Sequence, residues 1–440
     1  MIDQKLAADS PLRDPGFEFG VATSSFQIEG ATGVGDRRPS IWDTFCREPG
    51  RILDGSNGDI ACDHYHRFED DLDMLAELGF RHYRLSLAWP RLMDINGRPN
   101  TKGLDFYRRL LEACHERQIV PNVTLYHWDL PADMRGGWLN RDTAYRFADY
   151  ASAVAYRLGD LIPRIATLNE PWCSSILSYD IGAHAPGHAN RSEALTAAHH
   201  LLLASGLGIQ AMRAERSNAS LGLVLNFESL VAATEDDQRA RDLAHAERNR
   251  FWLDRLTQRE PSSDLMAQGQ VPERPGDAKI MAEPLDWLGV NYYTESQVMR
   301  ADNRRGYDTV TKPGIEKTHI GWDIAPQGLT DLLVEFDRDY DLPPIYITEN
   351  GAACDDSVNA TGGVNDDQRR RYFRDHLAAV ESAMENGVDI QGYYAWSLMD
   401  NFEWAFGYSQ RFGLVHVDYD TQLRTPKQSA LDWQRFLASR

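Results

Sequence analysis

Two glutamates in the sequence have the setting that cleavage of a glycosidic bond requires. Glu170 stands in the string TLNEP and Glu349 in the string ITENG. Each ends a short β-branched run, and a breaker, Pro171 or Gly351, follows within two residues. A carboxylate at the end of a buried strand points out of the carboxyl edge of a sheet, where α/β folds carry their chemistry. Two carboxyl groups that face each other there can act as a nucleophile and an acid on one glycosidic bond.

The two carboxyl groups would need opposite protonation states at neutral pH, so their surroundings must differ. Glu349 is expected to be the ionised nucleophile, which Arg84 from another strand holds in place and keeps charged. Glu170 is expected to be the acid, because burial and the nearby charge of Glu349 raise its pKa. After the glycosyl–enzyme ester has formed, Glu170 would act as the base towards water. Asn169, beside the acid, can hydrogen-bond a ring hydroxyl of the sugar.

Buried strands that could position these groups recur along the whole chain, separated by amphipathic helical patterns. We expect eight, at 17–23, 82–86, 120–125, 165–168, 221–225, 287–290, 345–348 and 391–395. Eight strand–helix units without a linker or repeat predict a single closed (β/α)8 TIM barrel over residues 1–440, with elaborated loops at the C-terminal face of the strands. A doubly wound open sheet is the alternative, but Gly30, Gly33 and Gly35 have the wrong order for a GxGxxG phosphate loop.

The residues that emerge where these strands end are nearly all polar or capable of hydrogen bonding. They are Gln27, Arg84, His127, Glu170, Asn226, Tyr293, Glu349 and Trp396. A barrel with an inert top would not concentrate such groups at one edge, so the pattern predicts a polar pocket there.

Composition and charge narrow the class of partner. The net charge of −20 argues against nucleic acid and anionic membrane surfaces, and it is typical of a well-solvated surface. The five cysteines are odd in number and form no CxxC, which fits reduced thiols in the cytoplasm. The N-terminal segment has no apolar core of a signal peptide, and no run of eighteen apolar residues occurs. We therefore expect a cytoplasmic protein that does not bind a membrane.

Other chemistries find little support. The histidines cluster in pairs, but none stands in an HExxH or similar frame with a third ligand. No G-x-S-x-G elbow marks a serine nucleophile. We expect no metal and no cofactor. The histidine pairs are His64/His66, His184/His188 and His199/His200.

Ten strings in the right order resemble glycoside hydrolase family 1, the β-glucosidase-type enzymes, from Phe17 to about Pro426. They include FEFGVATSSFQIEGA, YRLSLAWPR, LYHWDLP, TLNEPW, HAPG, DWLGVNYY, ITENGAA and the long string GYYAWSLMDNFEWAFGYSQRFGLVHVDY. The resemblance implies that Glu170 is the acid/base and Glu349 the nucleophile. The chain departs from the family's usual pattern at Asp180. In the family, the stretch ahead of HAPG is usually rich in glycine, so Asp180 could alter the mouth of the cleft.

The resemblance also implies which residues bind the sugar. It places Gln27, His127, Asn169, Tyr293 and Trp396 in the pocket for the sugar ring, with Trp128 and Asn291 beside them. It implies that Glu403 and Trp404 bind the hydroxyls furthest from the reacting carbon. Phe412 would lie near C6 of the sugar, and Trp322 would form a wall on the aglycone side.

These observations together predict a retaining exo-β-D-glucosidase that acts on small β-glucosides or short oligosaccharides, as in cellulose degradation, with some activity on β-galactosides and β-fucosides. A β-galactosidase, β-fucosidase or transglycosylase is the nearest alternative. A 6-phospho-β-glucosidase is disfavoured, because a Glu403 carboxylate would repel a phosphate dianion. A sugar-binding protein without turnover is a third class, and a homo-oligomer is compatible with the sequence.

Overall fold

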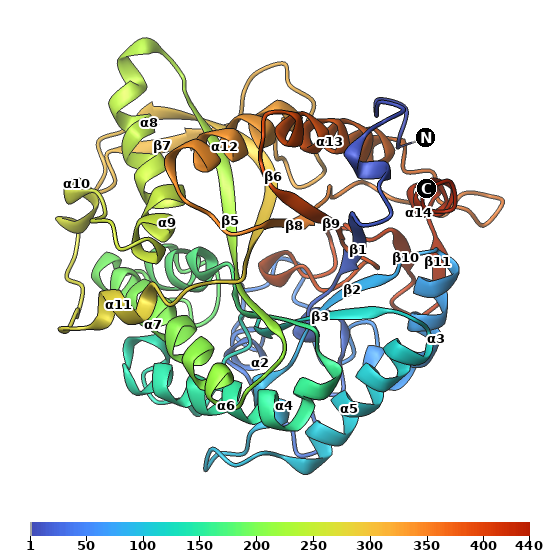
Figure 1. Ribbon diagram of the computed structural model, residues 1–440, viewed down its shortest axis with the longest axis horizontal. Helices are drawn as coiled ribbons and strands as arrows, with labels where there is room; N and C mark the ends of the chain where they lie inside the picture. Colours follow the sequence, from blue (N-terminus) through green and yellow to red (C-terminus); the bar gives the residue numbers. More distant parts are fainter. Residues whose placement is uncertain (1) are drawn as a thin grey trace.

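Eight strands of the chain pair side by side into a closed parallel barrel, and helices form a ring around it (Figure 1). The computed structural model describes residues 2–440. Going round the barrel, the order is β1, β2, β3, β4, β5, β6, β8 and β9, and β9 pairs in parallel with β1 to close it. The predicted (β/α)8 architecture is therefore confirmed.

The eight barrel strands coincide with the eight predicted stretches. They are β1 (Glu18–Ala22), β2 (His82–Ser86), β3 (Val120–Tyr126), β4 (Arg164–Asn169), β5 (Ser220–Ala232), β6 (Trp287–Arg300), β8 (Ile345–Asn350) and β9 (Ile390–Trp396). Two of them, β5 and β6, run well past their predicted ends, and β7 (Tyr307–Val310) pairs antiparallel with the end of β6. These extensions escaped prediction because they leave the barrel and lose its continuous apolar pattern.

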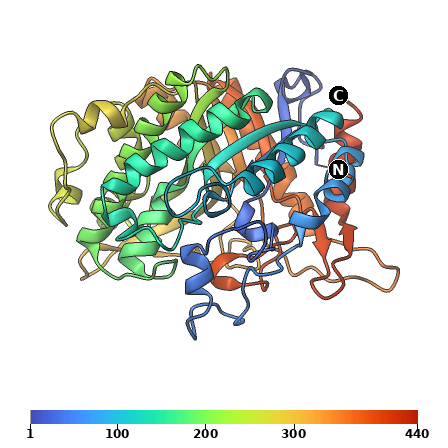
Figure 2. The ribbon, with the colours of Figure 1, turned by 90° about the horizontal axis from the view of Figure 1, so that it is seen from below.

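A helix covers the outside of the barrel after each strand. In chain order these helices are α3 (His64–Glu77), α5 (Thr101–Glu116), α6 (Asp142–Leu158), α7 (Arg191–Ala214), α8 (Gln238–His245) with α9 (Phe251–Leu256), α12 (Pro326–Asp339), α13 (Asp367–Glu385) and α14 (Gln428–Leu437). Short helices lie in the connections: α1 (Ser25–Ile28), α2 (Ile41–Phe45), α4 (Trp89–Leu92), α10 (Ser263–Met266) and α11 (Asp277–Met281). A small antiparallel pair, β10 (Val415–Val417) and β11 (Arg424–Pro426), precedes α14. Figure 2 shows the barrel from the side, with dark blue and orange-red segments gathered below the strands.

Large aromatic side chains fill the inside of the barrel against glycines on neighbouring strands. A Cβ atom at Gly20 would lie 2.5 Å from the Tyr394 ring, and one at Gly222 would lie 2.4 Å from the Trp287 ring. Interior space near the start of the strands is thus used up by packing, as in other barrels of this kind. Room for a ligand is left at the opposite end.

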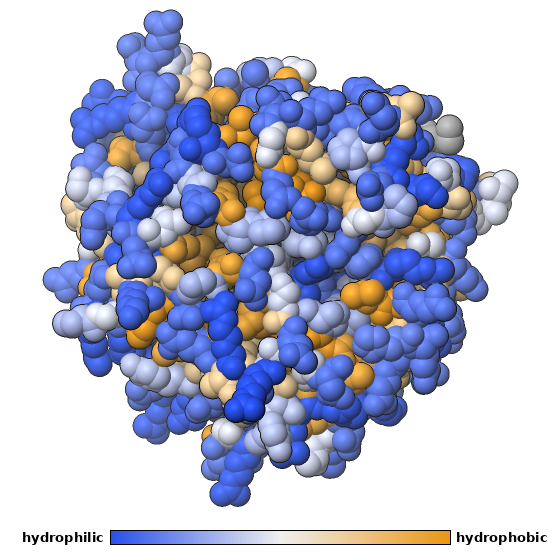
Figure 3. All heavy atoms as spheres, in the orientation of Figure 1, coloured by the Kyte–Doolittle hydropathy of each residue, from blue (hydrophilic) through white to orange (hydrophobic). Residues whose placement is uncertain are grey.

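The face seen in Figure 3 is largely hydrophilic, with scattered hydrophobic atoms. Within residues 2–440, none of the helices combines the length and the apolar character needed to cross a membrane. All five cysteines have free thiols.

Candidate active site

The carboxyl ends of the barrel strands surround a cavity of about 540 Å³. Both glutamates line it, together with eight of the predicted sugar-binding residues. Those eight are His127, Trp128, Tyr293, Trp322, Trp396, Glu403, Trp404 and Phe412. The fold thus brings residues from distant parts of the chain to one site.

Both carboxylate oxygens of Glu349 are held by donors from other strands. Glu349 lies in β8 and is 3% exposed. Arg84 in β2 donates Nη1–H to Oε1 of Glu349, and the Tyr293 hydroxyl donates to Oε2 at 2.6 Å. Arg84 also donates Nη2–H to Oδ1 of Asn169, at 2.7 Å. The two donors together fix the orientation of the Glu349 carboxyl group.

Glu170 follows β4 directly, in a left-handed backbone conformation (φ +47°) that is unusual for a residue with a side chain. Such strain is maintained only where the surroundings enforce it, and it is frequent at functional sites. The Asn291 amide donates to Oε1 of Glu170 at 2.6 Å, and the Cys173 thiol donates to Oε2 at 3.1 Å. The acid therefore has neutral donors where Glu349 has a cation.

The surroundings of Glu170 favour its protonated form. Burial raises the pKa of Glu170 to about 7, and the negative charge of Glu349 contributes to the rise. A carboxyl group with this pKa still carries its proton in a large fraction of molecules at neutral pH, whereas Glu349 has the Arg84 guanidinium beside it. An acid that holds a proton and a second carboxyl group bound by a guanidinium, both in the same cavity, can supply general acid and nucleophilic chemistry.

Behind the cavity surface, Asn169 links the surroundings of the two glutamates through its hydrogen bonds to Arg84 and Asn291. Its amide donates to Nε2 of His127 at 3.1 Å, and its backbone oxygen accepts from Nε1 of Trp128 at 3.0 Å. Burial, with a smaller contribution from the Arg84 charge, lowers the pKa of His127 well below its usual range, so the ring is neutral. With Nε2 accepting, we assign the ring proton to Nδ1, which is buried and has no hydrogen-bond partner within residues 2–440. Nδ1–H can therefore donate to a ligand hydroxyl.

Glu403 occupies another part of the cavity and differs from expectation. Burial raises its pKa to about 8, and the charges of Glu349 and Glu170 add to the effect. Glu403 is therefore mostly protonated at neutral pH, whereas a charged carboxylate was expected at this position. Its Oε2 is buried without a hydrogen-bond partner in the described part of the chain, so it can bond a sugar hydroxyl.

Three predicted sugar-binding residues do not line the cavity but lie fully buried behind its surface: Gln27, Asn169 and Asn291. The Gln27 amide donates to Oδ1 of Asn401 at 2.8 Å and to the backbone oxygen of Phe402 at 2.9 Å. Through these bonds Gln27 fixes the segment that carries Glu403. Asn291 likewise fixes Glu170 by its hydrogen bond to that carboxyl group.

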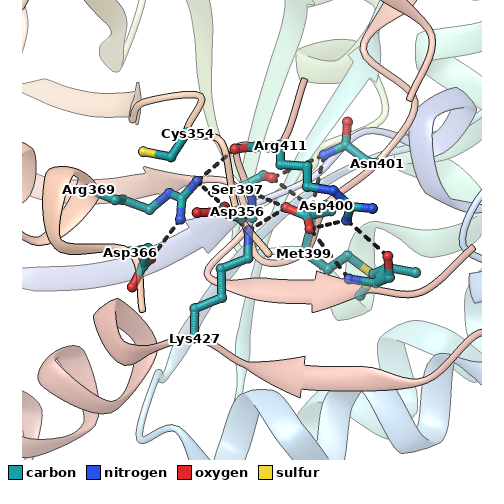
Figure 4. A network of polar contacts seen from close by, with 12 residues as sticks. Cys354, Asp356, Asp366, Arg369, Ser397, Met399, Asp400, Asn401, Arg411 and Lys427 are labelled. Carbon is teal, nitrogen blue, oxygen red and sulfur yellow. Dashed lines mark hydrogen bonds and ion pairs between the residues drawn. The ribbon is translucent and has the colours of Figure 1, made fainter. Parts of the chain in front are cut away.

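A buried network of charged side chains also holds the segment that carries Glu403 (Figure 4). Lys427 donates to Asp356 and to Asp400, both at 2.6 Å, and all three side chains are almost completely buried. Arg411 donates to the other oxygen of Asp400, also at 2.6 Å. Arg369 adds a bond of 2.7 Å to Asp356. The network anchors Asp400, three residues before Glu403, and so restricts where the Glu403 carboxyl can lie.

Aromatic rings form the remaining wall. Tyr293 and Trp322 have ring centroids 5.4 Å apart, and Phe412 lies about 6 Å from each of them. On the other side, the Trp404 ring lies 4.5 Å from that of Trp128. Ring faces of this kind suit the apolar faces of sugars.

The cavity also contains residues that the sequence analysis did not identify as site residues. The main ones are Trp172, Cys173, Leu177, His184, Glu228, Arg248, Ser296, Thr309, Val310, Thr311, Ile320 and Phe406. Cys173 lies three residues after Glu170, but the left-handed backbone of Glu170 places it outside the helix that follows, so helical spacing does not indicate their contact. Arg248 stacks 3.5 Å from the Trp172 ring and pairs with Glu228 at 3.0 Å. No local sequence pattern predicts these contacts of Arg248.

The histidine pairs have other roles. His64 bonds Asp71 at 2.8 Å, His199 bonds Asp277 at 2.9 Å, and His200 bonds the backbone oxygen of Trp138 at 2.8 Å. Within residues 2–440, no cluster of three or more His, Cys, Asp or Glu side chains could hold a metal ion.

Replacement of Cys173 by alanine and by serine is expected to shift the alkaline limb of the pH profile of kcat/KM in opposite directions. Burial raises the pKa of the Cys173 thiol well above its usual range, so Cys173 remains an S–H donor to Oε2 of Glu170. Cys173→Ala removes a donor that favours the carboxylate, and Cys173→Ser supplies a stronger one. We expect the pH at which kcat/KM falls to rise by roughly half a unit to one unit in the alanine variant and to fall in the serine variant. The other groups facing Glu170 (Glu349, Glu403, Tyr293 and Arg248) are unchanged in both variants, so limbs that move in the same direction would contradict this role.

Comparisons with known proteins find relatives over nearly the whole chain. The model of the family described as glycosyl hydrolase family 1 matches residues 12–440. A β-glucosidase of Agrobacterium sp. is 47% identical over 97% of this chain and 95% of that enzyme. A bifunctional β-D-glucosidase/β-D-fucosidase of Bifidobacterium breve is 45% identical over 96% of this chain and 97% of that enzyme. The solved structure of a family 1 β-glucosidase from Thermotoga maritima is similar with a TM-score of 0.94 at 37% identity, covering 98% of this chain and 99% of that one.

Proposed function

The chain belongs to glycosyl hydrolase family 1, and from this premise we propose that Glu349 and Glu170 cleave terminal, non-phosphorylated β-D-glucosyl residues with retention of configuration. The protein is a glycoside hydrolase of the β-glucosidase type. One observation carries the proposed mechanism: two carboxyl groups line the same cavity, one beside a guanidinium and the other beside neutral donors.

In the first step, a carboxylate oxygen of Glu349 attacks the anomeric carbon and forms an ester with it. The bond from that carbon to the aglycone oxygen breaks, and Glu170 gives its proton to the leaving oxygen. The charge of Glu349 is lost in the ester. Because that charge contributes to the raised pKa of Glu170, ionised Glu170 becomes easier to maintain at this stage.

In the second step, Glu170 takes a proton from a water molecule, whose oxygen attacks the anomeric carbon and displaces Glu349. Two displacements at one carbon restore the original configuration. We propose that His127, Trp396, Glu403 and Trp404 bind the sugar ring. The buried group (Gln27, Asn169, Asn291 and Arg84) acts beside them through the hydrogen bonds described above.

For the remaining wall of the cavity, we propose that Trp128, Tyr293 and Phe412 complete the sugar site and that Trp322 contacts the aglycone. We further propose that the barrel over residues 1–440 acts as one catalytic domain in the cytoplasm, where its five free thiols remain reduced. Short gluco-oligosaccharides from cellulose are the substrates we expect.

Covalent labelling tests this proposal. An activated 2-deoxy-2-fluoro-β-glucoside slows the second step and should leave the sugar on the peptide that contains Glu349. Active enzyme that hydrolyses aryl β-glucosides but carries no label, or carries it on another residue, would contradict the assignment. Aryl β-galactosides and β-fucosides, run in parallel, distinguish the neighbouring specificities.

A 6-phosphate on the sugar is expected to lower kcat/KM by about a hundredfold or more, because a buried dianion without a cation is strongly disfavoured. Among the described residues that line the cavity, Arg248 is the only arginine or lysine, and it already pairs with Glu228. Protonation of Glu403 weakens the repulsion expected from its charge but supplies no compensating cation. Kinetics with 4-nitrophenyl β-glucoside and with its 6-phosphate measure the ratio of the two kcat/KM values. A ratio near one would contradict the prediction that the pocket excludes a 6-phosphate.

A further inference from the structure

Asp180 forms a buried centre of charge outside the catalytic pocket. It lies in the π-helix Cys173–Ile181, which begins three residues after Glu170, and its side chain is completely buried. Three arginines bond its carboxylate: Arg191 at 3.2 Å, Arg305 at 2.9 Å, and Arg304, which also donates to the Asp180 backbone oxygen at 3.0 Å. Charge-assisted hydrogen bonds from three guanidinium groups to one buried carboxylate fix the relative positions of the segments that carry them.

A second carboxylate completes what we call the Asp180 cluster, consisting of Asp180, Arg191, Glu247, Arg304 and Arg305. Arg191 donates to Glu247, and Glu247 also accepts from the Tyr307 hydroxyl at 2.8 Å. The cluster contains three cations and two anions. Removal of Asp180 would therefore leave three neighbouring guanidinium groups with a single anion.

The cluster joins two walls of the cavity. Arg304 and Arg305 lie in the turn between β6 and β7, and this hairpin contributes Ser296, Thr309 and Val310 to the cavity lining. The π-helix that carries Asp180 contributes Cys173 and Leu177 to the same lining. Asp180 thus sets the position of the hairpin relative to the helix that follows Glu170.

The chemistry of the hairpin side of the cavity indicates what it would contact. Hydroxyl groups of Ser296, Thr309 and Thr311 lie in the lining, together with Glu228 and Arg248. Arg248 stacks on Trp172, which also lines the cavity. Polar donors and acceptors beside an aromatic face suit a hydroxyl-rich aglycone, such as further sugar units.

We propose that Asp180 is a specificity-determining residue that fixes the β6–β7 hairpin and so favours β-glucosides whose aglycone is itself an oligosaccharide long enough to reach it. This inference rests on the proposed function. The glucosyl–enzyme ester is the same for every β-glucoside, so loosening the hairpin acts on aglycone binding and on the first step, not on hydrolysis of the ester.

The test uses a double variant, Arg304→Ala with Arg305→Ala. It releases the hairpin but leaves Asp180 paired with Arg191, so no buried charge is left alone. Arg300→Ala removes an exposed arginine from the same hairpin and is the matched control. Asp180→Asn is the second variant, in which the carboxylate charge is lost at nearly constant volume.

We expect KM for cellotriose to be about tenfold higher in the double variant than in the unmodified enzyme. KM for methyl β-glucoside should stay within about twofold of its value in the unmodified enzyme. Hydrogen exchange across residues 301–311 should become faster in the same variant and stay unchanged in Arg300→Ala. Equal changes for both substrates, or unchanged exchange, would overturn the specificity role. Wild-type enzyme that hydrolyses neither substrate would overturn the proposed function itself, which separates the two failures.

Discussion

Replacement of Glu349 by alanine is expected to lower kcat for aryl β-glucosides by roughly 10⁴- to 10⁶-fold, as loss of a nucleophile does in other enzymes with covalent intermediates. Glu349→Gln should be similarly inactive, because an amide cannot form the glycosyl ester. The matched control is Glu385→Ala, an exposed glutamate near the end of α13, which should retain full activity.

The alanine variant allows a sharper test through azide. Removal of the side chain leaves space beside the anomeric carbon and leaves the Arg84 guanidinium, 1% exposed, without its anion. A small anion such as azide can occupy that space and attack an activated substrate once. A single displacement inverts the anomeric carbon, so the product should be the α-glucosyl azide, identifiable by NMR. A β-configured product would show that Glu349 is not the nucleophile.

An unpaired buried guanidinium also lowers stability, by about 3–5 kcal/mol when one partner of a buried pair is removed. Thermal unfolding of the alanine and glutamine variants therefore has to accompany the kinetics. A folded, inactive Glu349→Gln protein would separate lost chemistry from lost structure.

Replacement of Glu170 by alanine is expected to produce a loss that depends on the leaving group. Substrates with a poor leaving group, such as cellobiose, need the proton and should lose about 10²- to 10⁴-fold in kcat/KM. A 2,4-dinitrophenyl glucoside needs no proton, so its first step should be nearly unaffected while breakdown of the ester slows. Azide should restore turnover and give the β-glucosyl azide, because Glu349 still performs the first displacement. An equal loss for both leaving groups would contradict the role of Glu170 as acid.

The pH dependence of the same variant provides an independent check. Glu170 must carry its proton to act as the acid, and its pKa is raised to about 7. Activity of the unmodified enzyme on cellobiose should therefore fall as pH rises through about 7, while the proton is retained below that value. The alkaline limb should disappear in Glu170→Ala. If the alkaline limb remained in Glu170→Ala, it would have to arise from the ionisation of another group.

The barrel architecture could be predicted from the amino-acid sequence alone, as could the presence of Glu170 and Glu349 at the ends of its strands. Continuous apolar runs of four to seven residues mark barrel strands because both faces of such a strand are buried, and all eight runs lie in the closed barrel. Glu170 and Glu349 stand out because a strand that ends in a carboxylate and a breaker is a local pattern. Agreement of many short strings with one family also needs no coordinates.

Three features required the folded chain: the protonation of Glu403, the positions of Gln27 and Asn291 behind the cavity surface, and the partners of Cys173. It also revealed the Asp180 cluster, in which Arg304 and Arg305 lie far from Asp180 in the sequence. The physical reason is the same in each case. A pKa depends on burial and on charges brought near by folding, and a contact between distant segments depends on how the loops beyond the strands pack, which periodic patterns do not encode.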